Sequence, residues 1–471
     1  MPTDKEYAIT KQKSRLLYAK IRLLDYNFQE VDEWENYVIG TPSFTVDSSS
    51  SLRRSANLSL VPIDKSFDVE SGNKIWLDKY VKIFMGIKDI HTNEIVYTDM
   101  GIYIINNPQR TYSADNNTIS LSCIDLMAKM TGLRNGNLVG LPHIIYANQN
   151  VRLAIIETIK LAGFTKYIVE ECPYDVPNEI NIDVGGTVYD ILQQLLDIYP
   201  NYQMYFDVEG VFHYDKIPTG YNEPIMVTDD IWENVLINYS IDYDFENVKN
   251  VIEVYGKTHD IKNYGLALVE NDTYKLTIAS VNKLRDNLKI GFNAPSKITE
   301  PYINLNDYGK KALKNEDGSF AKLSEEENMY YVAKYLEDKD YFLFMGEITP
   351  HAEAKDENPD SPFYINGNLG KIRIVLSGGD YDNIFMTSLA KERAEWELYT
   401  RCKVKDSISV TCVPIYWLDV NWLVEITLPN KYGKEQTLQY IIKSINTTIG
   451  VNGTQTINMM RYYPEFEEKR G

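Results

Sequence analysis

The sequence predicts a mainly β protein with two related β-barrels, a small α+β module between them, and a polar segment inserted in the second barrel. Apolar and polar residues alternate in the first and last thirds of the chain, as is typical of half-buried strands. A strand–loop–strand segment that begins at Gly101 recurs at Leu438, and helical spacing begins at about Asn148. The expected domains are residues 1–147, 148–240 and 241–471, with the insertion at about 260–340.

The first region is predicted to be a closed or nearly closed barrel. Its apolar positions repeat every second residue between turn-rich stretches, and we expect a turn at Pro108 and another at Asp115–Asn117. The strands expected from this pattern are Leu16–Leu24, Phe44–Val46, Ala56–Val61, Trp76–Gly86, Gly101–Asn107 and Thr118–Cys123.

The module that follows should contain two helices and a hairpin. Residues Val151–Ala162 place apolar side chains on one helical stripe, and Gly163 stands where a glycine ends a helix. Thr187 with Asp190 forms a capping-box pattern, and Pro200 ends that second helix. The turn at 207–210 then predicts the hairpin.

Strand signals return at Asn247 and are interrupted by a polar stretch from about His259 to Glu327, which we interpret as an insertion. Ser324 and Glu327 fit a capping box, which predicts a helix that carries Met329 to Leu336. After it, the expected elements are the strands Tyr341–Ile348, Gly370–Leu376 and Ser407–Cys412, and the helix Phe385–Tyr399.

The internal repeat carries the most information. Tyr103-Ile104-Ile105 aligns with Tyr440-Ile441-Ile442, and one extra residue then brings Thr118-Ile119 onto Thr456-Ile457. Upstream, Trp76-Leu77 parallels Trp422-Leu423. Chance similarity between two β-hairpins is the alternative to a duplicated barrel. With two similar barrels per chain, three chains present six barrels around one axis, so a three-fold object can dock onto a six-fold one.

Charge and composition exclude several classes of protein. The 48 Lys and Arg against 67 Asp and Glu give a net charge of −19, which disfavours groove-type binding of nucleic acid. No apolar run approaches the roughly 20 residues of a membrane-spanning helix, and the amino terminus does not resemble a secretory signal. The four cysteines are expected to be reduced core thiols: Cys123, Cys172, Cys402 and Cys412.

Several long phrases of the sequence resemble the baseplate hub proteins of phage tails and of phage-tail-like bacteriocins, particularly those of Gram-positive hosts. The phrases are WLDKYVKIFMGI, YTDMGIYIINNPQRTYSADNNTISLSCIDLMAKMTG, TVYDILQQLLDIYPNYQMYFDVEGVFHYD and LAKERAEWELYTRCKVKDSISVTCVPIYWLDVNWLVEI. The resemblance implies tube-like barrels in a homotrimer that forms a pseudo-six-fold ring around a channel. It also implies partners, namely the hexameric tail tube and distal tail proteins, a central spike or tip, and other baseplate subunits.

A search for chemistry gives no catalytic, cofactor-binding or metal-binding residue and predicts no cofactor. The histidines lack metal-ligand spacing: His91, His143, His213, His259 and His351. The acidic groups Glu170-Glu171, Asp229-Asp230 and Glu325–Glu327 are better explained as solvated faces or helix starts than as glycosidase carboxylates. Gly378-Gly379-Asp380 lacks a phosphate-loop pattern, and Asn315–Gly318 lacks calcium-ligand spacing.

The sequence therefore favours a non-enzymatic structural protein of the virion tail baseplate, made and assembled in the bacterial host cytoplasm. The alternatives are a receptor- or glycan-binding tip protein that uses the insertion, and the front end of a tail-associated lysin. The 36 tyrosines suit wet protein interfaces and also suit glycan binding, so they do not separate these readings. Acidic side chains in the channel would repel passing DNA.

Overall fold

The computed structural model describes residues 2–267 and 341–463 with short gaps, together with the strand segments 273–275, 302–304, 322–324 and 329–336. The gaps are residues 36–37, 114, 116, 141, 173, 177–178, 200, 386, 404, 430–432, 434 and 451, and side chains are not described for 259–348 or for residue 405. The predicted insertion, which only the alternative hypothesis assigns to receptor or glycan binding, therefore lies largely outside the described residues, as do Glu325–Glu327 and Asn315–Gly318.

The predicted mainly β fold is confirmed. Mainly antiparallel strands from both ends of the chain join into one sheet, which has 13 strands in the described part of the chain. In this sheet the amino-terminal strands are β1 (Leu17–Leu24), β2 (Glu30–Glu35), β3 (Val38–Asp47), β4 (Arg54–Leu60), β5 (Tyr80–Lys88), β6 (Ile95–Tyr112) and β7 (Asn117–Asp125). The later strands are β13 (Ile225–Val227), β14 (Leu236–Asp244), β24 (Lys405–Cys412), β25 (Leu423–Pro429), β26 (Glu435–Thr448) and β27 (Gln455–Tyr462).

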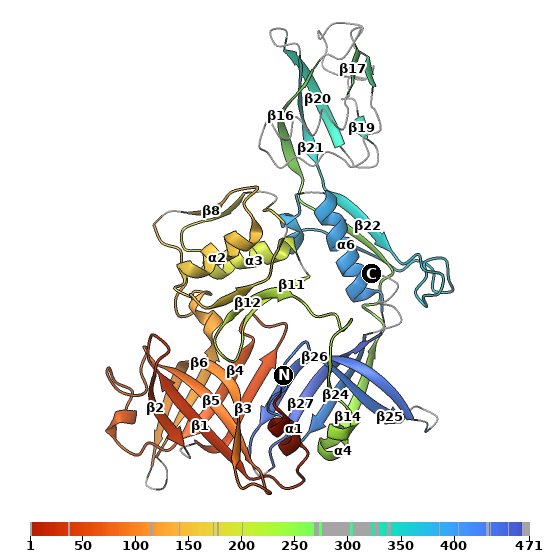
Figure 1. Cartoon of the computed structure of the whole chain (residues 1–471). Coiled ribbons are helices and arrows are strands. Elements are labelled where there is room, and N and C mark those ends of the chain that lie inside the picture. Colours follow the sequence, from red (N-terminus) through yellow and green to blue (C-terminus); the bar gives the residue numbers. More distant parts are fainter. Residues whose placement is uncertain are drawn as a thin grey trace.

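The strands curl around two hydrophobic cores, one for each half of the sheet (Figure 1). Trp34, Phe67 and Leu121 are buried in the amino-terminal core, and Trp232 and Ile457 in the carboxy-terminal core. Short helices lie beside these halves: α1 (Asp4–Thr10), η1 (Lys65–Phe67), η2 (Leu126–Lys129) and α4 (Asp229–Val235). We refer to the two halves as barrel 1 and barrel 2.

The central module has the predicted helices and hairpin, and it lies against both barrels (Figure 1). Thr187 and Asp190 form the expected capping box. Gly163 has a φ of +82°, which favours glycine after a helix. The module contains β8 (His143–Ile145), α2 (Val151–Leu161), β9 (Tyr167–Val169), β10 (Ile180–Ile182), α3 (Val188–Ile198), β11 (Tyr202–Phe206) and β12 (Phe212–Lys216).

The remaining described elements connect the module with barrel 2. The helix α6 (Thr387–Arg401) packs on β15 (Val251–Tyr255) and β22 (His351–Lys355), close to its predicted position. Gly378 leads into a 3₁₀ helix, η3 (Gly379–Asn383). The other strands are β16 (His259–Ala267), β17 (Thr273–Lys275), β18 (Tyr302–Asn304), β19 (Lys322–Ser324), β20 (Met329–Leu336), β21 (Tyr341–Ile348) and β23 (Arg373–Leu376).

Two local predictions are wrong. Residues Met329–Leu336 form the strand β20, not a helix, and pair antiparallel with β21. This segment is rich in Tyr and Val, which favour strands, and the pairing partner outweighs the capping pattern. Pro108 does not begin a turn, because β6 continues through it to Tyr112. Proline is tolerated there because, among the described strands, this part of β6 pairs with β7 alone.

Candidate assembly interface

The two barrels share one strand order. In barrel 1 the order is β3-β4-β7-β6-β5, and in barrel 2 it is β14-β24-β27-β26-β25, with every neighbouring pair antiparallel. The order along the chain also agrees, since β5, β6 and β7 correspond to β25, β26 and β27. This shared topology argues for duplication and against the chance similarity of two isolated hairpins.

The repeat extends to an irregularity in the backbone. The β6–β7 register shifts between Ile105 and Asn107, and the β26–β27 register shifts between Ile442 and Ser444. These positions are equivalent when Tyr103 is placed on Tyr440, as the sequence predicts. A β-bulge bends its strand and increases the local twist, so the same bulge gives both hairpins the same curvature.

The structure corrects the second half of the predicted alignment. Leu121 pairs with Pro108, and Ile457 pairs with the equivalent Ile445. Ile457 therefore corresponds to Leu121 and not to Ile119, a difference of two residues. The segment between the paired residues Ile445 and Ile457 in barrel 2 is one residue shorter than the segment between Pro108 and Leu121 in barrel 1. The matching Thr-Ile pairs in the sequence had predicted the opposite, a barrel 2 loop that is one residue longer. Alternation preserves the face of each residue after a two-residue shift, so the burial pattern could not reveal the error.

The barrels are joined by pairing between β3 and β26. Asp47 lies opposite Ser444, Thr45 opposite Asn446, and Ser43 opposite Thr448. The Thr45 hydroxyl donates a hydrogen bond to Asn446 Oδ1 across the joint, at 3.0 Å. On the other face of the same pair, Phe44 and Val46 are buried with Ile445 and Thr447. The joint thus continues both the polar face and the apolar face of the sheet.

The face of the sheet opposite the cores is formed mainly by hydroxyl and amide side chains. Cross-strand hydrogen bonds link several of them, including Asn458 Nδ2 to Ser444 Oγ at 2.9 Å. In barrel 1 they are Ser43, Thr45, Ser55, Asn57, Ser59, Asn107, Gln109, Thr111, Thr118, Ser120 and Ser122. In barrel 2 they are Asn238, Ser240, Ser407, Ser409, Thr411, Ser444, Asn446, Thr448, Thr456 and Asn458. We call this surface the hydroxyl face; Asp47, Asp242, Asp244 and Met460 interrupt it.

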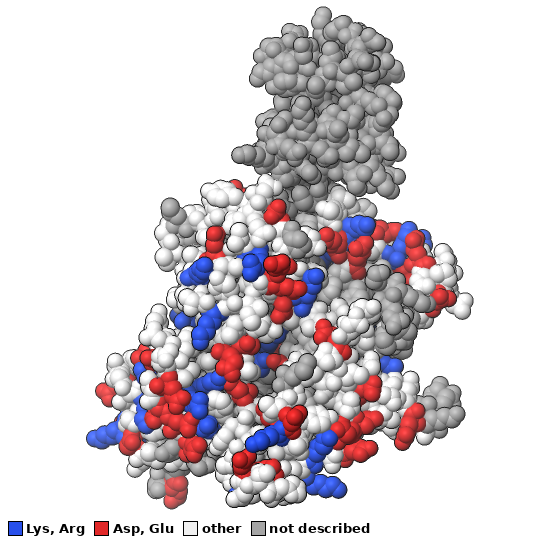
Figure 2. Space-filling view, viewed as in Figure 1, with Lys and Arg blue, Asp and Glu red and all other residues white. Residues whose placement is uncertain are grey.

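Charged residues lie mostly elsewhere. Figure 2 shows acidic and basic side chains interspersed over the visible face of the molecule. The amino-terminal edge strands illustrate this mixture, because Arg22 forms ion pairs with Glu30 and Glu33. Mixed charges of this kind keep a surface soluble without a large field of one sign.

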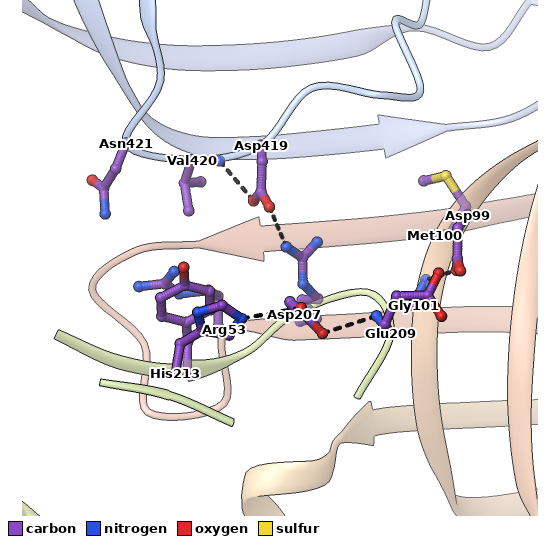
Figure 3. A network of polar contacts seen from close by, with 12 residues as sticks. Arg53, Asp99, Met100, Gly101, Asp207, Glu209, His213, Asp419, Val420 and Asn421 are labelled. Atoms are coloured by element: carbon purple, nitrogen blue, oxygen red, sulfur yellow. Dashed lines mark hydrogen bonds and ion pairs between the residues drawn. The ribbon is translucent and has the colours of Figure 1, made fainter. Parts of the chain in front are cut away.

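A buried polar junction fixes the module to both barrels (Figure 3). Gln203 on β11 accepts hydrogen bonds through Oε1 from Arg53 Nη2 at 2.7 Å and from Asn421 Nδ2 at 2.8 Å. Arg53 belongs to the loop before β4 in barrel 1, and Asn421 to the loop before β25 in barrel 2. Arg53 also lies 3.9 Å from the Tyr205 ring centre, in cation–π geometry. One glutamine therefore links three parts of the chain.

The junction continues into the hairpin through a histidine held by two carboxylates. His213 Nε2 lies 3.0 Å from Asp207 Oδ2, and His213 Nδ1 lies 3.5 Å from Asp215 Oδ2. Burial lowers the pKa of His213, but these two partners outweigh it and raise the pKa to about 9. Asp215 also accepts a hydrogen bond from Gln203 at 2.9 Å. The charged imidazole thus supports the residue that contacts both barrels.

Three further ion pairs complete the junction. Arg54 pairs with Asp419 across the two barrels, with side-chain exposures of 6% and 26%. Lys82 of barrel 1 lies 2.6 Å from Asp99 and 2.6 Å from Glu209 at the tip of the β11–β12 hairpin. Burial raises the pKa of Asp99 to about 6, against the opposing effect of Lys82. A Cβ on the neighbouring Gly210 would lie 3.1 Å from Ile102, so the tip packs closely on barrel 1.

The chemistry-bearing residues considered from sequence are dispersed. The four cysteines are buried, and none of them forms a disulfide. Burial raises the pKa of Cys123 and of Cys412 to about 12, which disfavours the thiolate that a nucleophile needs. Asp229 and Asp230 lie in the first turn of α4 and have separate partners: Asp229 accepts from Thr427, and Asp230 accepts from Tyr7 and Lys11. Within the described residues, no group of three or more His, Cys, Asp or Glu side chains could hold a metal ion.

The sequence assigned His213 no role, and it did not identify Arg53, Gln203 or Asn421. The signal for His213 was the pattern Asp207–His213–Asp215 along a hairpin, which places alternate side chains on one face. The other three residues are far apart in sequence and carried no pattern. Among the helices of the described residues, none has both the length and the apolar character needed to span a membrane.

Comparison with known proteins gives matches in one domain model and in solved structures. Residues 360–466 match the model described as a domain of unknown function, DUF5048. No curated protein matches the chain in sequence. The 43 kDa tail protein of prophage MuSo2 from Shewanella oneidensis has a similar structure, with a TM-score of 0.50 and 10% identity over 95% of this chain and 99% of that one.

A tail protein from Neisseria meningitidis MC58 is equally similar. It also gives a TM-score of 0.50 and 10% identity, over 95% of this chain and 98% of that chain. Identity at this level establishes a shared fold and leaves function open. The chain therefore has the fold of these tail proteins, and the predicted resemblance is confirmed at the level of the fold.

Proposed function

We propose that the chain is a structural protein of the tail baseplate of a phage or phage-tail-like particle, where three copies form a ring of six barrels. The observation that carries this proposal is the β3–β26 joint, which fuses two barrels of the same topology into one continuous sheet. A joint that unites two similar barrels within a chain provides a template for uniting barrels of neighbouring chains. Closed cyclic symmetry is the usual outcome when such contacts repeat.

The proposed ring adapts three-fold to six-fold symmetry. Its six barrels would match a hexameric tail tube on one side, while its three chains would match a central spike or tip on the other. The proposed division of the chain follows from this: residues 1–147 and 241–471 supply the barrels, and residues 148–240 supply the module. Distal tail proteins and other baseplate subunits are the remaining partners, and assembly would take place in the host cytoplasm.

The hydroxyl face is the proposed wall of the channel. The opposite face of the sheet carries both hydrophobic cores and their covering strands and helices. When a sheet closes into a ring, the bulkier face must lie outside, where the circumference is larger. With the four strands β3, β4, β7 and β6 and their four equivalents from each chain, the ring would have a backbone diameter of roughly 50 Å for ordinary strand spacing and tilt.

The composition of that wall differs from the expectation that acidic groups would line the channel. Its side chains are mainly serine, threonine, asparagine and glutamine, with Asp47, Asp242 and Asp244 as acidic exceptions. A nearly neutral wall of this kind neither attracts DNA phosphates nor repels them strongly. The net charge of −19 would therefore act mainly outside the proposed channel.

The module is the proposed attachment point for a neighbouring component. It lies at one end of the paired barrels (Figure 1), and the buried junction around Gln203 holds it there. Because contacts from both barrels converge on one side chain, a load on the module would be shared between the barrels. This arrangement suits a structural role, and we propose no enzymatic activity.

Light scattering on the purified chain, measured over a range of concentrations, tests the proposal. The expected mass is about 163 kDa, three times the chain mass of 54.3 kDa. A stable dimer or tetramer at all concentrations would contradict the ring, because neither supplies six barrels. A chain that stays monomeric at the highest soluble concentration would also contradict a ring formed by this chain alone.

A further inference from the structure

Two strand edges that correspond to the β3–β26 joint are open. Within the described residues, β14 pairs with β24 on one side and with no strand on the other. The second half of β6, from Asn107 to Tyr112, pairs with β7 alone. Large aromatic side chains at these edges are exposed: Tyr243 by 55%, Phe245 by 73% and Tyr112 by 79%. Open edges with exposed aromatic groups are typical pairing sites for another chain.

The two edges are the structural equivalents of the joint itself. Ala56 of β4 and Ile408 of β24 are equivalent, because they pair with equivalent residues of β7 and β27. Phe44 of β3 pairs with Ala56, and Ile241 of β14 pairs with Ile408, so Phe44 and Ile241 are equivalent too. The bulge positions place 444–448 of β26 on 107–111 of β6. The joint inside the chain thus pairs the β3 edge of barrel 1 with the β26 edge of barrel 2. The equivalent of β3 in barrel 2 is β14, and the equivalent of β26 in barrel 1 is the second half of β6; these two edges are not used in the joint.

We propose that β14 of one chain pairs antiparallel with residues 107–112 of β6 in a second copy, in the register of the β3–β26 joint. This inference rests on the proposed ring and specifies its contact. The register places Ser240 opposite the partner subunit's Thr111, and Asp242 opposite the partner subunit's Gln109. It also places Asp244 opposite the partner subunit's Asn107. The contact is head-to-tail, so it closes into a ring when three copies complete the rotation.

The side chains suit this register on both faces. Asp242 and the partner subunit's Gln109 replace Thr45 and Asn446, which hydrogen-bond across the internal joint at 3.0 Å. A glutamine amide donates readily to a carboxylate, so the polar contact is retained. On the core face, Ile241 and Tyr243 replace Phe44 and Val46, so the exposed tyrosine would be covered as Val46 is.

The backbone donors of β14 also point toward the open edge. In the internal joint, Ile449 N–H donates to the Pro42 carbonyl at 2.8 Å, and hydrogen-bonded positions alternate from there. Val413 N–H donates to the Val235 carbonyl, so the alternation along β14 leaves the Ile241 N–H facing away from β24. Pro108 lacks one donor in the proposed ladder, as Pro42 does in the internal one, and this costs a single hydrogen bond.

Disulfide cross-linking tests the register. Positions 111 and 240 form a non-hydrogen-bonded pair, with Cα atoms about 4.5 Å apart, which suits a disulfide. The chain with Thr111→Cys and Ser240→Cys should give covalent dimers and trimers on mild oxidation, and the trimer should be the largest circular product. The chain with Thr111→Cys and Asp242→Cys is the matched control, because its pair lies diagonally at about 7 Å and should cross-link at least tenfold less.

A proline variant provides a second measurement that does not depend on thiols. Ile241→Pro removes the donor that faces the open edge and leaves the β14–β24 ladder intact, while Ile241→Ala removes the same side chain without removing the donor. We expect Ile241→Pro to shift the oligomer to monomer with unchanged circular dichroism, and Ile241→Ala to retain the oligomer. A three-chain ring that fails to cross-link at 111 and 240 and tolerates Ile241→Pro would overturn this contact and leave the proposed function standing. A chain that never forms the ring would contradict the proposed function itself.

Discussion

Tyr103 and Tyr440 occupy the same position in the two barrels, yet within the described residues only the Tyr103 hydroxyl forms a hydrogen bond. Both side chains are buried and stand two residues before the shared bulge. Tyr103 donates to the Met100 carbonyl at 2.6 Å, whereas the Tyr440 hydroxyl makes no hydrogen bond of standard geometry and has the Arg461 guanidinium as its polar neighbour. The duplicated scaffold has therefore kept the ring and the register while the local polar contact has diverged.

This difference predicts unequal effects of the same substitution. Tyr103→Phe should lower the free energy of unfolding by about 1–2 kcal/mol, because the buried Met100 carbonyl loses its donor. Tyr440→Phe should change it by less than about 0.5 kcal/mol, because no hydrogen bond is lost. Urea denaturation of the two variants makes the comparison directly. Equal losses in both would show that the hydroxyl of Tyr440 is bonded.

The Arg54–Asp419 pair should behave as a buried ion pair across the barrels. Asp419→Asn leaves the buried guanidinium without its partner and should destabilise the chain by about 3 kcal/mol. Arg54→Met combined with Asp419→Asn should cost less than Asp419→Asn alone, because no charge is then left buried without a partner. A double-mutant cycle by chemical denaturation measures the coupling. Additive losses would contradict a direct pair.

The junction should make stability depend on pH through His213. Its pKa is about 9 in the folded chain and 6.5 in the reference state, so the folded chain binds this proton more tightly. The stabilisation is therefore complete below pH 6.5 and is lost as pH rises through about 9. It amounts to at most about 3 kcal/mol.

His213→Gln should remove this slope, and Asp207→Asn should reduce it by removing one carboxylate partner. Denaturation midpoints measured across this pH range provide the test. A slope that is unchanged in His213→Gln would assign the titration to another group.

The four cysteines should be unreactive in the folded chain. All are buried, and the thiol pKa values of Cys123 and Cys412 are about 12. A thiol reagent should therefore label no cysteine rapidly in native buffer and should label all four after denaturation. Rapid labelling of one site in the native chain would reveal local opening there. Slow labelling also provides a clean background for the cross-linking experiment.

The sequence predicted the barrels well because alternation reports directly on which face of a strand is buried. The repeated Tyr-Ile-Ile segment also aligned β6 with β26 in the register in which the structure places their two equivalent bulges. β14 was not identified from the sequence, although Tyr239 and Ile241 alternate with Asn238, Ser240 and Asp242 and pack against the core of barrel 2. Tyr243 continues the apolar face but is 55% exposed, because β14 is an edge strand within the described residues.

The polar junction could not be predicted from the sequence. Arg53, Gln203 and Asn421 come from three regions of the chain, and each is an ordinary polar residue in its local context. Their contact depends on the module being placed against both barrels, which no local periodicity encodes. The helix predicted at Met329–Leu336 failed for a related reason, because pairing with β21 decides its conformation and a capping pattern describes only its start.

Two-dimensional class averages of the purified oligomer test the central claim most directly. The account predicts an annular particle with six lobes around an open channel and rotational power at three-fold and six-fold orders. The three-fold signal would arise from the modules and the six-fold signal from the barrels. A compact two-fold particle, or a ring whose lobes are not a multiple of three, would contradict it.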